Sequence, residues 1–246
     1  MKITRIVKIG LAGFYGLLWS GGVFSYLFLG GPPEGVEWTA PTFLATASLL
    51  VFISMRRSEW PILLLGGAIG FASEAVGVKF GFPFGSYTYT ATLDPRWLGV
   101  PLVMAAAWVV LFAYVRQMVR RPLAAAAWMT AIDLVIDPLA ANGLGYWTWE
   151  HPGPYYGIPW SNFAGWFAVS FLLFSLDRRP VIPSAPVRWV GLSQIVFFTA
   201  IAFGTGAVLA GVFGVALLTL HAARRLRESG RWTRSNESIP PATPPR

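Results

Sequence analysis

Apolar residues in this chain fall into long runs that are separated by short polar, glycine-rich or proline-rich segments. Most of the runs approach the roughly 20 residues that an α-helix needs to cross a bilayer. Basic residues precede the first run, but the run is longer than the apolar part of a secretory signal and no A-x-A-like site follows it. We therefore predict retained membrane-spanning helices, near residues 9–29, 39–55, 60–78, 99–119, 122–141 and 160–176.

A further run, Val187 to Leu220, is too long for a single span. One helix would leave the Arg-rich tail outside the cell, whereas a tight hairpin at Gly204-Thr205-Gly206 would return it to the cytoplasm. Because charge favours the hairpin, we predict an all-α fold, a polytopic integral membrane helical bundle of about eight transmembrane helices with both termini cytoplasmic. Residues 1–230 form one transmembrane domain, and residues 231–246 are expected to be a disordered cytoplasmic tail.

Composition and charge placement agree with this topology. The chain is 55% hydrophobic and only 12% charged, whereas soluble domains are about 25% charged. Of its 19 Lys and Arg residues, all but Lys79 and Arg96 fall on one side of the predicted membrane. The net charge of +8 therefore follows the positive-inside rule of a multi-pass cell membrane protein and is not a nucleic-acid footprint.

The same composition limits the available chemistry. The chain has no cysteine and only two histidines, which excludes thiol nucleophiles and disulfides and argues against a multi-His metal site. We therefore expect neither a metal nor another cofactor.

Three acidic residues lie inside predicted spans, and these are the candidate catalytic residues: Glu74, Asp133 and Asp137. Ionisable groups inside a membrane are costly and are functional candidates by default. Asp133 and Asp137 are four residues apart, so they share a helix face, and Pro138 directly after them should kink or end that helix. Two carboxylates in such a place cannot both ionise cheaply, so at least one is expected to remain a proton donor. Alternatively, the pair binds a neighbouring helix or caps the break.

Two aromatic segments are predicted to lie outside, near the same acids. One is FGFPFGSYTYTATLDPRWLGVP after Lys79, which is too apolar for a solvated linker and should lie at the interface or fold back as a lid. The other follows Ala141 and enters the sixth span. Their rings either contact substrate or form an interfacial aromatic belt, and Asn162 either caps the sixth helix or binds a reacting water. The candidate substrate-binding residues are Tyr87, Tyr89, Trp147, Trp149, Tyr155, Tyr156, Asn162 and Trp166.

Buried acids and many rings in a helical bundle suit acid catalysis on a long apolar polyene or isoprenoid. Protonation of a trisubstituted alkene produces a tertiary carbocation, which aromatic rings stabilise by cation–π attraction. A second carboxylate can then accept a proton from the attacking water.

Several motifs together resemble a known family. GFPFGSYTYT from Gly81, LGVPL from Leu98, DLVIDPLA from Asp133, the pair Trp147 and Trp149, and YYGIPWSNFAGW from Tyr155 resemble the carotenoid biosynthesis family of CruF-type hydratases. The resemblance implies a lyase that adds water to the terminal 1',2' double bond of an acyclic ψ-end, in lycopene, γ-carotene or a C50 carotenoid. It implies a lipophilic carotenoid substrate and makes other carotenoid-pathway enzymes candidate partners. One departure is Asp94, where the family pattern has glycine before the proline.

Three other functions remain open. A membrane isoprenoid transferase or lycopene elongase would need aspartate-rich Mg²⁺–diphosphate motifs, and a single D-x-x-x-D is a poor match. A proton-coupled carrier would use the buried acids as a relay, although no paired broken helices are evident. A pigment-binding membrane protein would hold carotenoid without changing it.

Overall fold

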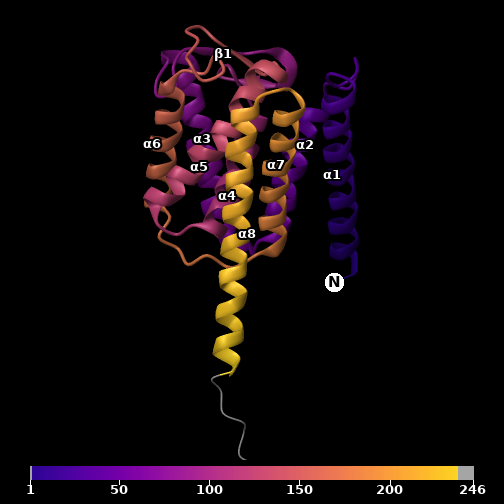
Figure 1. The fold of residues 1–246 in the computed structure, drawn as a ribbon, viewed down its shortest axis with the longest axis vertical. Helices are drawn as coiled ribbons and strands as arrows, with labels where there is room; N and C mark the ends of the chain where they lie inside the picture. The colour runs from indigo at the N-terminus through magenta and orange to yellow at the C-terminus, as the bar shows by residue number, and fades with distance from the viewer. Residues whose placement is uncertain (1, 238–246) are drawn as a thin grey trace, which may run out of the picture.

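The computed structural model describes residues 2–237, with side-chain surroundings described for residues 5–227. Over this range the chain forms eight α-helices arranged as an upright bundle (Figure 1). The helices are α1 (Lys2–Phe28), α2 (Thr39–Ser54), α3 (Trp60–Phe80), α4 (Val103–Met118), α5 (Pro122–Pro138), α6 (Trp160–Leu176), α7 (Ala185–Gly204) and α8 (Val208–Glu237).

The helices have the length and composition of membrane spans. Five described segments, at α1, α3, α5, α7 and α8, are long and apolar enough to cross a bilayer, and α2, α4 and α6 are shorter apolar helices. The centre of the bundle is α4, which contacts α2, α3, α5 and α7 and is almost completely buried from Trp108 to Val115. This confirms the predicted all-α membrane bundle.

The predicted hairpin at the end of the apolar chain is present. Helix α7 ends at Gly204, α8 begins at Val208, and Gly206 has φ of +82°, a left-handed conformation that glycine adopts without a steric cost. Both described ends of the chain consequently lie at the same end of the bundle (Figure 1). Helix α8 continues to Glu237, past the predicted start of the tail at Arg231, and residues 238–246 lie outside the described part.

The opposite end of the bundle is covered by short strands, and we call it the sheet end. Strand β1 (Tyr87–Tyr89) pairs antiparallel with β4 (Trp147–Trp149), and β2 (Arg96–Trp97) pairs with β3 (Val100–Pro101). A 3₁₀ turn, η2 (Ala91–Leu93), lies between β1 and β2. The aromatic segment after Lys79 thus folds back over the helices as a lid, one of the two predicted arrangements (Figure 1).

Pro138 ends α5 in a way that places β4. Since proline lacks a backbone N–H, the chain leaves the α-helix there and continues as a single wider turn of π-helix, η3 (Leu139–Gly143). The amide of Leu144 donates to the carbonyl of Leu139 at 2.7 Å, and that of Tyr146 donates to the carbonyl of Ala140 at 2.8 Å. The chain then enters β4, so the residues of this strand follow closely on the two acids of α5.

The other end of the bundle, which we call the basic end, contains a buried ion network. Arg116 on α4 is only 2% exposed and donates to Glu59 of the 3₁₀ turn η1 (Arg57–Glu59) at 2.8 Å. It also pairs with Asp177, which follows α6. A single guanidinium therefore joins α4 to the segments that flank α3 and α6, and all three side chains have their charges compensated.

We expect Arg116→Met to destabilise the protein, because two carboxylates would lose their buried cation. Removal of one partner from a buried ion pair costs about 3–5 kcal/mol. Thermal unfolding in detergent measures the loss. Arg120→Met is the matched control, since Arg120 lies at the same end and is exposed. Equal melting temperatures for the two variants would show that the network contributes little.

Candidate active site

Asn162 holds the two aspartates of α5 together. Its side-chain nitrogen donates to Oδ2 of Asp133 and to Oδ2 of Asp137, both at 2.8 Å. All three residues are at most 3% exposed. The four-residue spacing puts the carboxyl groups on one face of α5, and this face packs against α6, which carries Asn162. An amide has two N–H donors, so one asparagine serves both carboxyl groups.

Glu74 on α3 lies beside this pair and is surrounded by hydrogen-bond donors. The hydroxyl of Tyr87 donates to Oε2, the hydroxyl of Tyr89 donates to the same oxygen at 3.0 Å, and the indole nitrogen of Trp108 donates to Oε1 at 3.1 Å. Glu74 itself is 4% exposed. It therefore fixes three rings that come from the lid strand β1 and the central helix α4.

The two tyrosines of β1 remain donors at neutral pH. Burial raises the pKa of the Tyr87 and Tyr89 hydroxyls above the ordinary value, and the neighbouring Glu74 carboxylate raises both further. A proton at each hydroxyl is what the hydrogen bonds to Glu74 require.

A small polar cavity lies among these groups. Its volume is about 20 Å³, enough for one water molecule, which needs roughly 10–15 Å³ and two to four polar partners. The indole nitrogens of Trp147 and Trp149 are buried; that of Trp147 interacts with Asp137, whereas that of Trp149 has no partner among the described residues. The cavity is lined by Glu74, Tyr87, Tyr89, Met104, Asp133, Asp137, Trp147, Trp149, Asn162 and Trp166.

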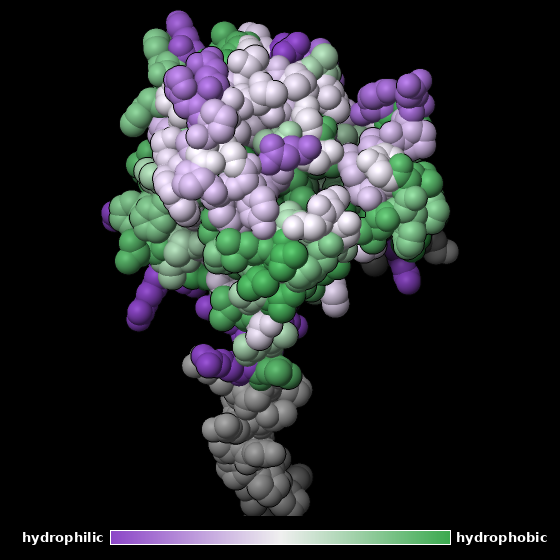
Figure 2. All heavy atoms as spheres, turned by 45° about the horizontal axis from the view of Figure 1, so that its top comes forward, coloured by the Kyte–Doolittle hydropathy of each residue, from purple (hydrophilic) through white to green (hydrophobic). Residues whose placement is uncertain are grey.

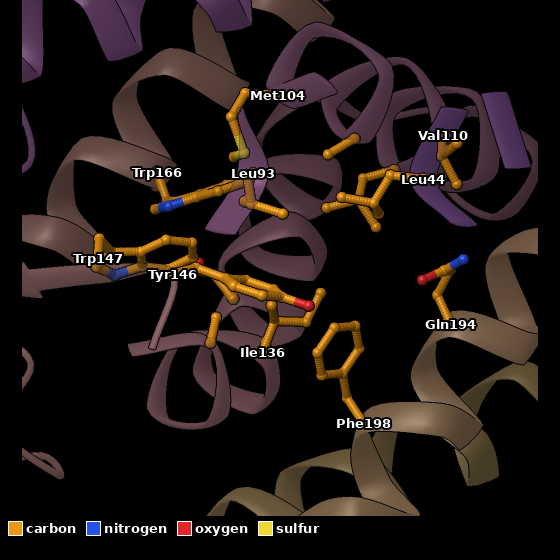
Figure 3. A pocket seen from close by; sticks show the side chains of 14 residues that line it. Leu44, Leu93, Met104, Val110, Ile136, Tyr146, Trp147, Trp166, Gln194 and Phe198 are labelled. Carbon is orange, nitrogen blue, oxygen red and sulfur yellow. The ribbon is translucent and has the colours of Figure 1, made fainter. Parts of the chain in front are cut away.

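A second cavity of about 70 Å³ adjoins the first and is almost entirely apolar (Figure 3). It shares four lining residues with the polar cavity, of which Asp133 is the only carboxylic acid. Trp166, another shared residue, stacks on Trp108 with ring centroids 4.3 Å apart and planes 7° apart. The apolar cavity is lined by Leu44, Leu93, Met104, Ala107, Val110, Leu111, Asp133, Ile136, Ala140, Tyr146, Trp147, Trp166, Gln194 and Phe198.

Most of the residues singled out from the sequence meet here, but two do not. Tyr155 donates to the carbonyl of Leu134 at 2.8 Å and packs on Phe163. The hydroxyl of Tyr156 accepts from the amide of Leu209 at 3.0 Å. Neither ring lines the two cavities, because the tight turn between β4 and α6 directs both toward α5 and α8; they hold the loop on the bundle.

Sequence reasoning missed several residues that the fold brings to the cavities. Met104 and Trp108 come from α4, where apolar side chains look like ordinary core. Gln194 carried a signal, since it is a polar amide within an apolar span, and it donates to the Tyr15 hydroxyl at 3.0 Å. Tyr146 directly precedes the recognised tryptophan pair, but only the π-helical turn before it decides that its ring enters the apolar cavity.

No metal centre is evident in the part of the chain with described side chains. There, no group of three His, Cys, Asp or Glu residues is arranged to hold a metal ion. The expectation that no cofactor takes part stays a prediction.

Comparison with known proteins places these features in a family. Bisanhydrobacterioruberin hydratase of Haloarcula japonica is 38% identical over 117 residues, which is 41% of this chain and 39% of the relative. The chain thus matches about two fifths of that protein's length. No solved structure matches significantly. The family model described as carotenoid biosynthesis protein matches residues 39–224, which include every residue that lines the two cavities. The chain therefore belongs to the carotenoid biosynthesis protein family.

Proposed function

We propose that this protein is a carotenoid hydratase, a hydro-lyase that adds water across the terminal 1',2' double bond of an acyclic ψ-end. The observation that carries the proposal is the position of Asp133 at the boundary between an apolar cavity and a cavity of one-water size. Hydration of an alkene needs an acid, an apolar site for the alkene and a held water, and these meet there. The matched relative is named a hydratase, which supports the same reaction. Lycopene, γ-carotene and C50 carotenoids carry suitable ends.

The reaction begins with a proton held by the aspartate pair. Asp133 and Asp137 are buried and share one amide donor, so two negative charges there would be costly and the pair retains one proton. Asp133 faces the apolar cavity and transfers this proton to the alkene carbon C2'. The π electrons form the new C–H bond, and the positive charge develops at the tertiary carbon C1'. Trp147 and Trp166 line both cavities and stabilise the cation through their ring faces.

Water from the polar cavity completes the addition. The indole N–H of Trp149, which has no hydrogen-bond partner among the described residues, donates to the water oxygen and leaves a lone pair for the attack on C1'. Asp137, which lines only the polar cavity, accepts the proton that the water loses. Transfer of this proton from Asp137 to Asp133 restores the starting state, so the net change is one alkene plus one water giving one tertiary alcohol.

Glu74 has a different role from the aspartates in this scheme. Its oxygens accept from Tyr87, Tyr89 and Trp108, so it acts as a positioning residue for the lid and for the Trp108–Trp166 stack. Of the three acids singled out from the sequence, we therefore propose Asp133 and Asp137 as catalytic residues, and Glu74 as a residue that positions its neighbours.

Orientation in the membrane follows from charge. The basic end carries the Arg-rich segments, so we infer that this end and both termini face the cytoplasm and that the site lies in the outer half of the membrane. We expect alkaline phosphatase fused after Glu237 to be inactive and a fluorescent protein fused there to fluoresce. Phosphatase inserted in the loop between α1 and α2 should be active. The reverse pattern would contradict the inferred orientation.

The wild-type reaction is tested in a bacterium that accumulates lycopene, γ-carotene or a C50 carotenoid. We expect a more polar pigment that is heavier by one water, and growth in ¹⁸O-labelled water should place the label in the product. Unchanged pigment with all three substrates, from protein shown to be inserted in the membrane, would favour the pigment-binding or carrier alternatives.

Asp133→Asn and Asp137→Asn should each abolish most of the hydration. Asparagine keeps the size of the side chain but cannot exchange the proton, and loss of general acid–base catalysis typically costs about 10²–10⁴-fold in rate. Product per unit of membrane-inserted protein is the measurement. Asp94→Asn is the matched control, because Asp94 lies at the sheet end in an exposed ion pair with Arg96. If both aspartate variants retain the wild-type rate, the proposed acid is wrong.

Trp149→Phe tests the water site. The substitution keeps an aromatic ring but removes the indole N–H, so we expect the hydration rate to fall by about 3–10-fold, the worth of one hydrogen bond, with substrate retention unchanged. Trp128→Phe is the control, since Trp128 is a buried tryptophan on α5 that lines neither cavity. Equal rates in the two variants would remove Trp149 from the mechanism.

A further inference from the structure

A large open crevice separates α1 from the rest of the bundle. Its volume is about 460 Å³, within the roughly 300–1,000 Å³ typical of small-molecule sites. Figure 2 shows this side of the surface hollowed beside the N-terminal helix, with apolar residues at the floor. The walls come from α1, α2, α7, η3 and the loop after α1, and include Leu18, Phe43 and Phe197.

The crevice adjoins the apolar cavity beside Asp133. Leu44, Tyr146 and Phe198 line both spaces, and Figure 3 shows these three side chains around one part of the cavity, with Trp147 and Trp166 at another. The apolar cavity in turn shares Asp133 with the polar cavity. Three adjoining spaces therefore lie in sequence between the surface of the bundle and the proposed acid.

Helix α1 is attached to the bundle in a way that leaves this space open. Only 6% of the residues in its most apolar stretch are buried. It is held by the Tyr15 hydroxyl, which bonds to the Ser193 hydroxyl at 2.7 Å, and by the Trp19 indole, which donates to the Ser193 carbonyl at 2.8 Å. Nearer the sheet end, the hydroxyl group of Tyr26 on α1 interacts with the side chain of Tyr146. The residues of α1 that line the crevice, from Leu17 to Tyr26, lie in the half of the helix nearer the sheet end.

We propose that this crevice holds the polyene chain of the substrate while its ψ-end reaches through the apolar cavity to Asp133. The inference rests on the proposed function and deepens it by naming where the unreacted part of the molecule binds. A substrate dissolved in the bilayer arrives from the side, and α1, only 6% of whose most apolar stretch is buried, is the helix beside which it would enter. The apolar cavity of about 70 Å³ accommodates only the end of such a chain, so the remainder needs the crevice. Helix α1 precedes the residues matched by the family model and supplies one wall.

Gly21 offers a position from which a large side chain can fill the crevice. It lines the crevice, and a Cβ atom added there meets nothing within 4 Å. Gly13 is an equally open position on the same row of α1, but it lies nearer the basic end and does not line the crevice. Gly21→Trp and Gly13→Trp are therefore the same change on the same helix, inside and outside the proposed site.

The test measures lycopene retained by purified protein in the Asp133→Asn background, where bound substrate is not converted. We expect Gly21→Trp to retain at least about tenfold less lycopene than Gly13→Trp, a loss equivalent to about 1.4 kcal/mol of binding free energy. In the protein with Asp133 intact, Gly21→Trp should lower hydration to a similar extent, and Gly13→Trp should match the unsubstituted protein.

The outcomes separate this proposal from the hydratase proposal. If the unsubstituted protein hydrates carotenoid and the two tryptophan variants retain and convert equal amounts, the crevice is not the polyene site although the hydratase proposal stands. If no carotenoid is hydrated but Gly21→Trp alone loses lycopene, the crevice binds the polyene and the hydratase proposal fails. Displacement of co-purified phospholipid by Gly21→Trp, with lycopene retention unchanged, would identify the crevice as an ordinary lipid site and overturn the proposal.

Discussion

The cost of placing carboxyl groups inside an apolar bundle shapes the sheet end of this protein. Glu74, Asp133 and Asp137 are each at most 4% exposed, and buried carboxyl groups are tolerated only with hydrogen-bond partners. Those partners come from α4, α6 and the lid strand β1. Because the donors are spread over the fold, satisfying three acids also fixes the relative positions of the helices and the lid.

The two ends of the bundle differ in how completely their buried polar groups are paired. At the basic end Arg116 is matched by Glu59 and Asp177, so the network is complete and has a structural role. At the sheet end the satisfaction is incomplete, since the indole N–H of Trp149, a residue that lines the cavity of one-water size, has no hydrogen-bond partner among the described residues. Incomplete satisfaction is costly, and in the proposed reaction a water in this cavity would supply the missing partner.

The three adjoining spaces have different roles in the proposed reaction. A carbocation must be protected from premature contact with water, so the alkene end lies in an apolar cavity and water is confined to a neighbouring space of about 20 Å³. Asp133 is the one carboxyl group that faces both. In the proposed arrangement, the crevice beside α1 would hold the part of the substrate that the two cavities are too small to enclose.

The sequence alone was sufficient for the architecture, because hydropathy, charge placement and turn residues act locally or along the chain. Apolar run lengths predicted the helices, the Arg-rich tail predicted the turn at Gly204-Thr205-Gly206, and the acids inside predicted spans made Asp133 and Asp137 candidate site residues. The sequence also singled out Asn162 and the rings of β1 and β4, which line the same polar cavity as the acids. None of these inferences required knowing which helices touch.

Contacts between distant segments were decided only by the tertiary structure. The sequence offered Asn162 as a helix cap or a water ligand, and the packing of α5 on α6 made it the bridge between the aspartates. Tyr155 and Tyr156 looked equivalent to the other rings, but the turn before α6 directs them elsewhere. In the sequence Trp108 could not be distinguished from an ordinary core residue, and only the packing of α4 on α3 shows that its indole contacts Glu74. Each outcome depends on the direction of a side chain across a helix interface, which local periodicity does not specify.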